Sequence, residues 1–99
     1  MALTTAVFVG DSHKWVDELA AKAKSFKIGA GKEDGIDLAP VAYKDLKDRI
    51  VRIIKSAPGE GAKIVLDGSD FVHPQFPQGN FVAPTIIDNV TTNMTCYKE

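Results

Sequence analysis

The chain has 99 residues, of which 44% are hydrophobic and 25% charged, and its formal net charge at pH 7 is −1. This length and composition allow one small folded unit and are not typical of a disordered chain. The balanced charge gives no electrostatic reason to expect nucleic acid or an anionic membrane as a partner. The sequence also has no apolar run approaching the roughly 18 residues that a transmembrane helix needs.

The first part of the chain predicts a strand and two amphipathic helices. Residues 3–9 are β-branched and apolar, and Gly10 ends them, which is typical of a buried strand. Residues 12–26 predict a helix because apolar side chains recur there at helical spacing, at Trp15, Leu19, Ala23 and Phe26. Residues 27–39 contain three glycines among charged residues and predict a loop. Residues 42–57 predict a second helix, with its apolar stripe at Leu46, Ile50, Ile53 and Ala57.

The second part predicts two short strands joined by a long loop. Residues 63–66 read as a strand, and Asp67-Gly68 is a strong turn signal that ends it. Residues 69–80 predict an irregular loop. Residues 81–90 form a strand-like run, which Pro84 restricts to a sheet edge or a bulge.

The order of these elements predicts the α/β class, with a small sheet covered by the two amphipathic helices. Residues 1–99 then form a single segment. The first and last strands would leave unpaired sheet edges, which favours a part of a larger domain over a complete one. We therefore expect the isolated chain to be marginally stable or to self-associate.

A glycine-rich stretch, Gly29-Ala30-Gly31-Lys32, invites comparison with a phosphate-binding loop. Such a loop needs a further upstream glycine, a Ser or Thr after the lysine, and a preceding strand. None of these accompanies the stretch, which follows a predicted helix. We expect a plain connection between helices.

The histidines and the single cysteine do not form a recognisable site in the sequence. His13 and His73 lie far apart without metal-ligand spacing, so we predict no metal site and expect both rings to be exposed. Cys96, the only cysteine, excludes an intramolecular disulfide. It could be a nucleophile only with a base supplied in space, and a small, partly buried apolar role is favoured.

Three phenylalanines, Phe71, Phe76 and Phe81, alternate with prolines in and after the long loop. They could form an apolar contact surface for another segment or subunit. They could equally form a small core beneath the loop. The sequence leaves both alternatives open.

Several stretches resemble the catalytic domain of the aldehyde dehydrogenase superfamily, in the same order along the chain. The opening residues 1–9 resemble the segment directly after the nucleophile in methylmalonate-semialdehyde dehydrogenases, where Gly-Gln-Arg-Cys precedes Met-Ala. Three further matches are residues 37–40 (Asp-Leu-Ala-Pro), 60–63 (Glu-Gly-Ala-Lys) and 79–87 (Gly-Asn-Phe-Val-Ala-Pro-Thr-Ile-Ile), and the tail, 93–99, resembles the lead-in to Glu-Glu-Ile-Phe-Gly-Pro. Ala39 and Ala83 stand where the family has glycine, and alanine would strain those turns if they need positive φ.

The resemblance implies a segment of an NAD-dependent, coenzyme-A-acylating methylmalonate- or malonate-semialdehyde dehydrogenase. In a complete enzyme of this kind a thiolate attacks the semialdehyde, hydride passes to NAD, carbon dioxide is lost and the acyl group moves to coenzyme A. The family's nucleophile would sit immediately before Met1. The general base and the cofactor domain would lie earlier. We therefore expect this chain to be inactive alone and to bind neither NAD nor coenzyme A alone.

The same resemblance suggests an active-site flank formed by Met1, Ala2, Lys98 and Glu99, with no catalytic, cofactor-binding or metal-ligating residue in the chain itself. Expected partners are the rest of the dehydrogenase or other subunits of a homo-oligomer. The expected location is the mitochondrial matrix in a eukaryote and the cytoplasm in a bacterium. The alternative is a degenerate, non-enzymatic fragment that acts as a binding or assembly module. An independent enzyme that uses Cys96 is disfavoured, since no base or oxyanion motif accompanies that residue.

Overall fold

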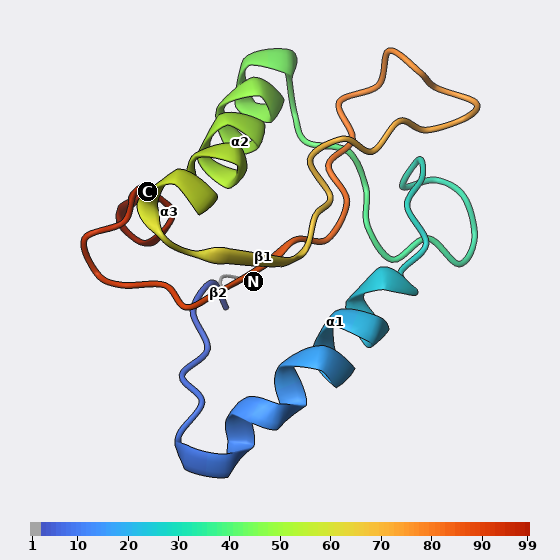
Figure 1. Cartoon of the computed structure of the whole chain (residues 1–99). Helices are drawn as coiled ribbons and strands as arrows, with labels where there is room; N and C mark the ends of the chain where they lie inside the picture. The colour runs from blue at the N-terminus through green and yellow to red at the C-terminus, as the bar shows by residue number, and fades with distance from the viewer. Residues whose placement is uncertain (1–2) are drawn as a thin grey trace.

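A two-stranded antiparallel sheet lies between two helices in the computed structural model, which describes residues 3–99 (Figure 1). The helix α1, Val16–Lys24, lies on one side of the sheet, and the helix α2, Lys44–Ser56, lies on the other. The predicted α/β arrangement, a small sheet covered by two helices, is therefore confirmed. Within residues 3–99, no helix is both long enough and apolar enough to cross a bilayer.

The predicted strand over residues 3–9 is wrong. The segment contains no strand, and Leu3, Val7 and Val9 are 89%, 83% and 79% exposed. A strand needs a neighbour to accept and donate its backbone hydrogen bonds. Among the described residues, no such neighbour pairs with this segment. Its β-branched and apolar side chains therefore remain mostly exposed to solvent.

The first predicted helix forms over a slightly different range. A 3-10 helix, η1 (Gly10–Trp15), leads directly into α1, which ends at Lys24. Gly10 turns the chain at φ 58, and the Ser12 hydroxyl donates a hydrogen bond of 2.8 Å to the Val9 carbonyl. In these helices only Val16 is buried, so most of the predicted apolar stripe faces outward.

The second predicted helix, residues 42–57, corresponds closely to α2. Its inner side buries Ile54, and Ala57 immediately after it is fully buried. A short 3-10 helix, η2 (Pro58–Glu60), then leads to Gly61, whose φ of 102 is readily adopted only by glycine. This turn directs the chain into the first strand.

The sheet pairs β1, Lys63–Leu66, with β2, Ile86–Asp88. The register places Ile64 opposite Ile87, and an irregularity follows before Leu66 meets Ile86. The prediction of β1 is confirmed. The predicted strand over residues 81–90 is correct only at its centre, because the stretch through Pro84 makes no regular ladder.

The C-terminal tail, too short to assign from sequence, forms the brief helix α3, Thr95–Lys98. Just before it, Met94 is buried together with Ala57 and Ala62, and Ile87 and Cys96 pack against this cluster. The cluster joins α2, β1, β2 and α3. It is the apolar centre of this part of the molecule.

Gly68 lies where two backbone segments meet closely. Its N–H donates to the Thr85 hydroxyl at 3.0 Å, and its carbonyl accepts the N–H of Ala83 at 3.0 Å. A Cβ at Gly68 would lie 2.0 Å from the Ala83 carbonyl oxygen, well inside van der Waals contact. The alanines at 39 and 83 themselves carry no positive φ, since Asn89 is the one non-glycine residue with positive φ among residues 3–99. The strain that the missing family glycines suggested is therefore absent.

Replacing Gly68 with alanine should lower the free energy of unfolding by about 2 to 3 kcal/mol, because the new methyl group must displace backbone. Gly59→Ala is the matched control, since a Cβ there meets no atom within 4 Å. Urea denaturation followed by circular dichroism measures both variants. Equal stability of the two variants would contradict the close backbone contact.

Candidate functional site

One groove brings together residues from near both ends of the described chain. It has a volume of about 550 Å3 and is lined by residues 4–8, by the segment around Asp88, and by Cys96 and Tyr97 of α3. We call it the terminal groove. A smaller groove of about 270 Å3 continues along the same N-terminal residues toward Val16 and Leu19 of α1.

The predicted active-site flank lies only partly within the described residues. Met1 and Ala2 lie outside them. Lys98 ends α3, and the Glu99 carboxylate pairs with the guanidinium of Arg49 on α2. Residues 4 and 5 at one end and residues 96 and 97 at the other line the terminal groove. The structure thus places the neighbours of both predicted flank pairs around one groove.

His13 and Asp88 form a polar contact at the wall of this groove. The Nε2 of His13 lies 2.9 Å from Oδ2 of Asp88, linking η1 to β2 across 75 positions of sequence. The N–H of Asn89 does most to hold the pKa of Asp88 below its ordinary value. Partial burial opposes this effect, while His13 and Lys63 add to it. No sequence spacing indicated this pair.

Cys96 has the partly buried, apolar role that the sequence favoured. It packs against the cluster of Ala57, Ala62 and Met94, and it also lines the terminal groove. His13 lines the same groove but is bound to Asp88, and no hydrogen bond within residues 3–99 reaches the Cys96 sulfur. Among the residues it describes, the structure therefore shows no base hydrogen-bonded to the thiol, of the kind found in the nucleophile–base pairs of covalent catalysis.

The prediction that both histidines are exposed is wrong for His73. His13 is exposed, but His73 is only 8% exposed and stacks on Phe81 with ring centroids 4.9 Å apart. Its Nδ1 accepts the N–H of Gln75 at 3.2 Å, which satisfies that ring nitrogen. Within the described part of the chain, no group of three or more His, Cys, Asp or Glu residues could hold a metal ion.

The aromatic residues of the long loop gather around His73. Phe81 is 3% exposed, whereas Phe76 is 42% exposed. Phe71 meets Phe81 edge to face, with centroids 6.4 Å apart. These contacts favour the small core beneath the loop, and Phe76 leaves part of it open to solvent.

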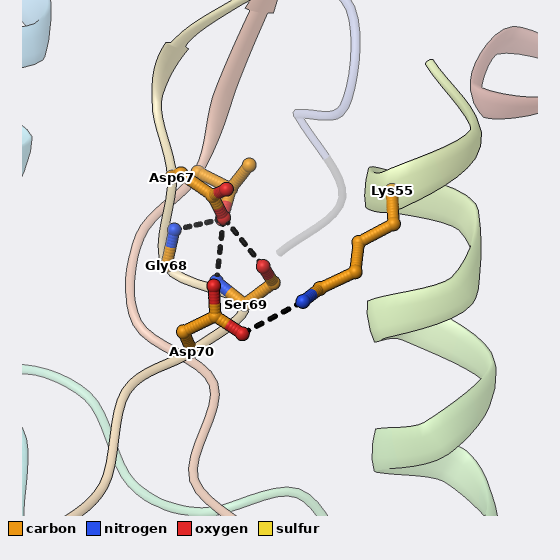
Figure 2. Close-up of polar contacts among 6 residues, drawn as sticks. Lys55, Asp67, Gly68, Ser69 and Asp70 are labelled. Atoms are coloured by element: carbon orange, nitrogen blue, oxygen red, sulfur yellow. Dashed lines mark hydrogen bonds and ion pairs between the residues drawn. The ribbon is translucent and has the colours of Figure 1, made fainter. Parts of the chain in front are cut away.

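A second polar cluster joins α2 to the end of β1 (Figure 2). Oδ1 of Asp67 accepts the N–H of Ser69 at 2.8 Å and its hydroxyl at 2.6 Å. Next to it, Lys55 of α2 donates to Asp70 at 2.7 Å. The Ser69 hydroxyl is the main reason that the pKa of Asp67 lies below its ordinary value, and Asp70 raises the pKa of Lys55. The cluster stabilises the turn after β1, and each of its two carboxylates accepts a hydrogen bond from another residue of the cluster.

The glycine-rich stretch 29–32 follows α1 as an ordinary loop, as expected. Gly29 is buried, and a Cβ there would meet the Ile36 side chain at 2.6 Å. Because Gly29 has no side chain, Ile36 from a later part of the loop packs closely against it. A phosphate cradle needs open backbone N–H groups. The N–H of Gly29 is not open, because it donates to the Leu38 carbonyl at 3.1 Å.

Comparisons with known proteins connect this geometry to one family. The model of the aldehyde dehydrogenase family matches residues 3–99. The mitochondrial, acylating methylmalonate-semialdehyde dehydrogenase of Arabidopsis thaliana is 50% identical over 99 residues, which are all of this chain and 16% of that protein. The predicted resemblance is confirmed.

Solved structures agree with the fold. The methylmalonate-semialdehyde dehydrogenase of Oceanimonas doudoroffii superposes with a TM-score of 0.85 at 34% identity, covering 92% of this chain and 19% of that one. A putative methylmalonate-semialdehyde dehydrogenase of Sinorhizobium meliloti, solved in complex with NAD, gives a TM-score of 0.84 at 33% identity, with 89% and 18% coverage. The chain therefore spans less than a fifth of the length of these relatives.

Replacing Ser69 with alanine should raise the pKa of Asp67 toward its ordinary value, because the hydroxyl is the largest cause of the lowering. The pKa of Asp88 should not change, since the main cause of its lowering is the hydrogen bond from the N–H of Asn89. Carboxyl carbon shifts followed by NMR across an acid titration report both groups. An unchanged pKa of Asp67 in Ser69→Ala would refute the assignment.

Asp67 and Asp88 also determine how we expect the stability of the fold to change at acid pH. A lowered pKa in the folded state means that Asp67 and Asp88 stabilise the fold fully above their unfolded pKa of about 3.9. This contribution is lost as the pH falls through the folded pKa values. The stability of Asp88→Asn should therefore depend less on pH below about 4 than that of the wild type. Urea midpoints measured between neutral and acid pH check this, and parallel curves for the two proteins would count against it.

Proposed function

Since the chain belongs to the aldehyde dehydrogenase family, we propose that it forms part of the catalytic domain of a methylmalonate- or malonate-semialdehyde dehydrogenase and is inactive by itself. The observation that carries the proposal is 50% identity to the Arabidopsis thaliana enzyme across all 99 residues. A superposition over 92% of the chain on a structure of the same enzyme class supports it. The plant relative is an acylating, mitochondrial enzyme.

The proposed complete protein uses NAD and coenzyme A. The Sinorhizobium meliloti structure in complex with NAD supports the first of these. We propose that other parts of the complete protein hold NAD. The packing of the glycine-rich loop supports this, because Ile36 fills the space next to Gly29. The proposed location is the mitochondrial matrix in a eukaryote and the cytoplasm in a bacterium.

Within that protein, the proposed role of this chain is to build one wall of the active site. The terminal groove is lined by residues 4–8, Cys96 and Tyr97. In the sequence these residues are close to Met1 and Ala2 at one end and to Lys98 and Glu99 at the other. These four residues remain the proposed flank. Cys96 is assigned to packing, because its side chain contacts the cluster of Ala57, Ala62 and Met94.

The proposal is tested by grafting. Residues 1–99 replace the matching segment of the Arabidopsis thaliana enzyme, and NADH formation is followed with methylmalonate semialdehyde, NAD and coenzyme A. We expect the chimera to retain activity within about tenfold of the parent, since a shift of about 1.4 kcal/mol in the barrier changes the rate tenfold. A chimera that folds and assembles as the parent does, yet forms no NADH, would contradict the proposal.

The isolated chain should form no NADH in the same assay, and its Cys96→Ser variant should likewise form none. The reason is that the thiol packs in a core cluster and has no base bound to it. Activity of the isolated chain that disappears in Cys96→Ser would identify Cys96 as a nucleophile and overturn the assignment to packing. The alternative role as a binding or assembly module is addressed by size-exclusion chromatography of the isolated chain mixed with the parent enzyme.

A further inference from the structure

The start of α3 is held by a carboxylate from a distant part of the chain. Glu60 accepts the backbone N–H of Thr95 with both carboxylate oxygens, at 3.2 and 3.1 Å. The Thr95 hydroxyl donates to Oε1 of the same carboxylate at 2.8 Å. The preceding residue, Met94, makes no side-chain hydrogen bond to the helix end. Glu60 therefore supplies a cap that the local sequence does not provide.

The position of Glu60 is fixed by the end of α2. Glu60 closes η2 by donating its N–H to the carbonyl of Ala57 at 3.1 Å, and the N–H of Ala62 bonds to the same carbonyl at 3.0 Å. Gly61 between them has φ 102. A Cβ at Gly61 would lie 3.7 Å from the terminal methyl of Met94, so this turn packs directly beside the residue that precedes α3. Through the cap, the start of α3 is therefore held at a fixed position relative to the end of α2.

The other end of α3 has a second anchor, which lies on α2 itself. Arg49 of α2 pairs with the carboxylate of Glu99 directly after α3, across 50 positions of sequence. The buried methionine Met94, just before α3, packs with Ala57 and Ala62, which follow α2. Two polar contacts and one apolar contact therefore hold the segment 94–99 against α2 and the turn that follows it.

We propose that Glu60 and Arg49 are positioning residues that fix α3 on α2 and thereby set the place of Lys98 and Glu99. This inference rests on the proposed function, in which Lys98 and Glu99 flank an active site. A helix of four residues is too short to hold its own direction, so its placement must come from tertiary contacts. Glu60 acts at the start of the segment and Arg49 at its end.

Amide hydrogen exchange of the isolated chain, measured by NMR, tests this role. Glu60→Ala and Thr95→Val each remove part of the cap, and Thr95→Val keeps the β-branched shape. We expect the exchange of residues 95–99 to accelerate roughly tenfold, as for loss of a helix cap, while the amides of β1 and β2 stay unchanged. Arg49→Gln should accelerate exchange most at Lys98 and Glu99. Glu18→Ala, on the exposed side of α1, is the control and should change neither region.

Two results would overturn the inference. One is wild-type exchange at residues 95–99 in both Glu60→Ala and Thr95→Val. The other is equal acceleration throughout β1, β2 and α3, because Glu60 would then support the whole fold instead of placing one segment. The test reads the placement of α3 without any enzyme assay. If exchange accelerates only at residues 95–99 and the chimera is inactive, the positioning role of Glu60 and Arg49 stands and the proposed function is rejected.

Discussion

The pairing of β1 with β2 is the constraint on which the rest of the structure depends. It brings Ile64 opposite Ile87 across the long loop and so sets Ala62, before β1, near Met94, after β2. Ala57 at the end of α2 completes that cluster, and α3 follows directly from it. Beyond β1, the same pairing forces Gly68 against Ala83, where there is no room for a side chain. The antiparallel pairing and the close contacts at either end of β1 thus place α2, the sheet and α3 relative to one another.

The N-terminal third is attached to this unit by much weaker means. Val16 is the one buried residue of η1 and α1, and the contact of His13 with Asp88 is the polar link to the sheet. An exposed histidine contact of this kind contributes little free energy. Leu3, Val7, Val9, Trp15 and Leu19 in this N-terminal third therefore remain exposed, in a chain that covers 16% of its Arabidopsis thaliana relative.

Helical periodicity was sufficient to predict that α1 and α2 exist, and the short apolar run before Asp67-Gly68 was sufficient to predict β1, although α1 buries only Val16. Local pattern failed for residues 3–9, whose composition predicts a strand but whose pairing partner is absent among the described residues. It also could not find the contacts of Glu60 with Thr95, Arg49 with Glu99 or His13 with Asp88, which join positions 35 to 75 residues apart. Asp67-Gly68 did predict the turn after β1, and the bond from the Ser69 N–H to Asp67 is the one that an Asp side chain commonly accepts in a turn. The family could be identified from sequence, because whole motifs carry that information.

The most direct test of this account is a nuclear Overhauser spectrum of the isolated chain. We expect cross-strand contacts between the backbone protons of Ile64 and Ile87, together with contacts from the Met94 methyl group to the methyl groups of Ala57 and Ala62. Both sets should be present in the 99-residue chain without any added partner. A spectrum in which the helical contacts of α2 persist while both sets are missing would show that the sheet does not organise this chain, and the account would then be wrong at its centre.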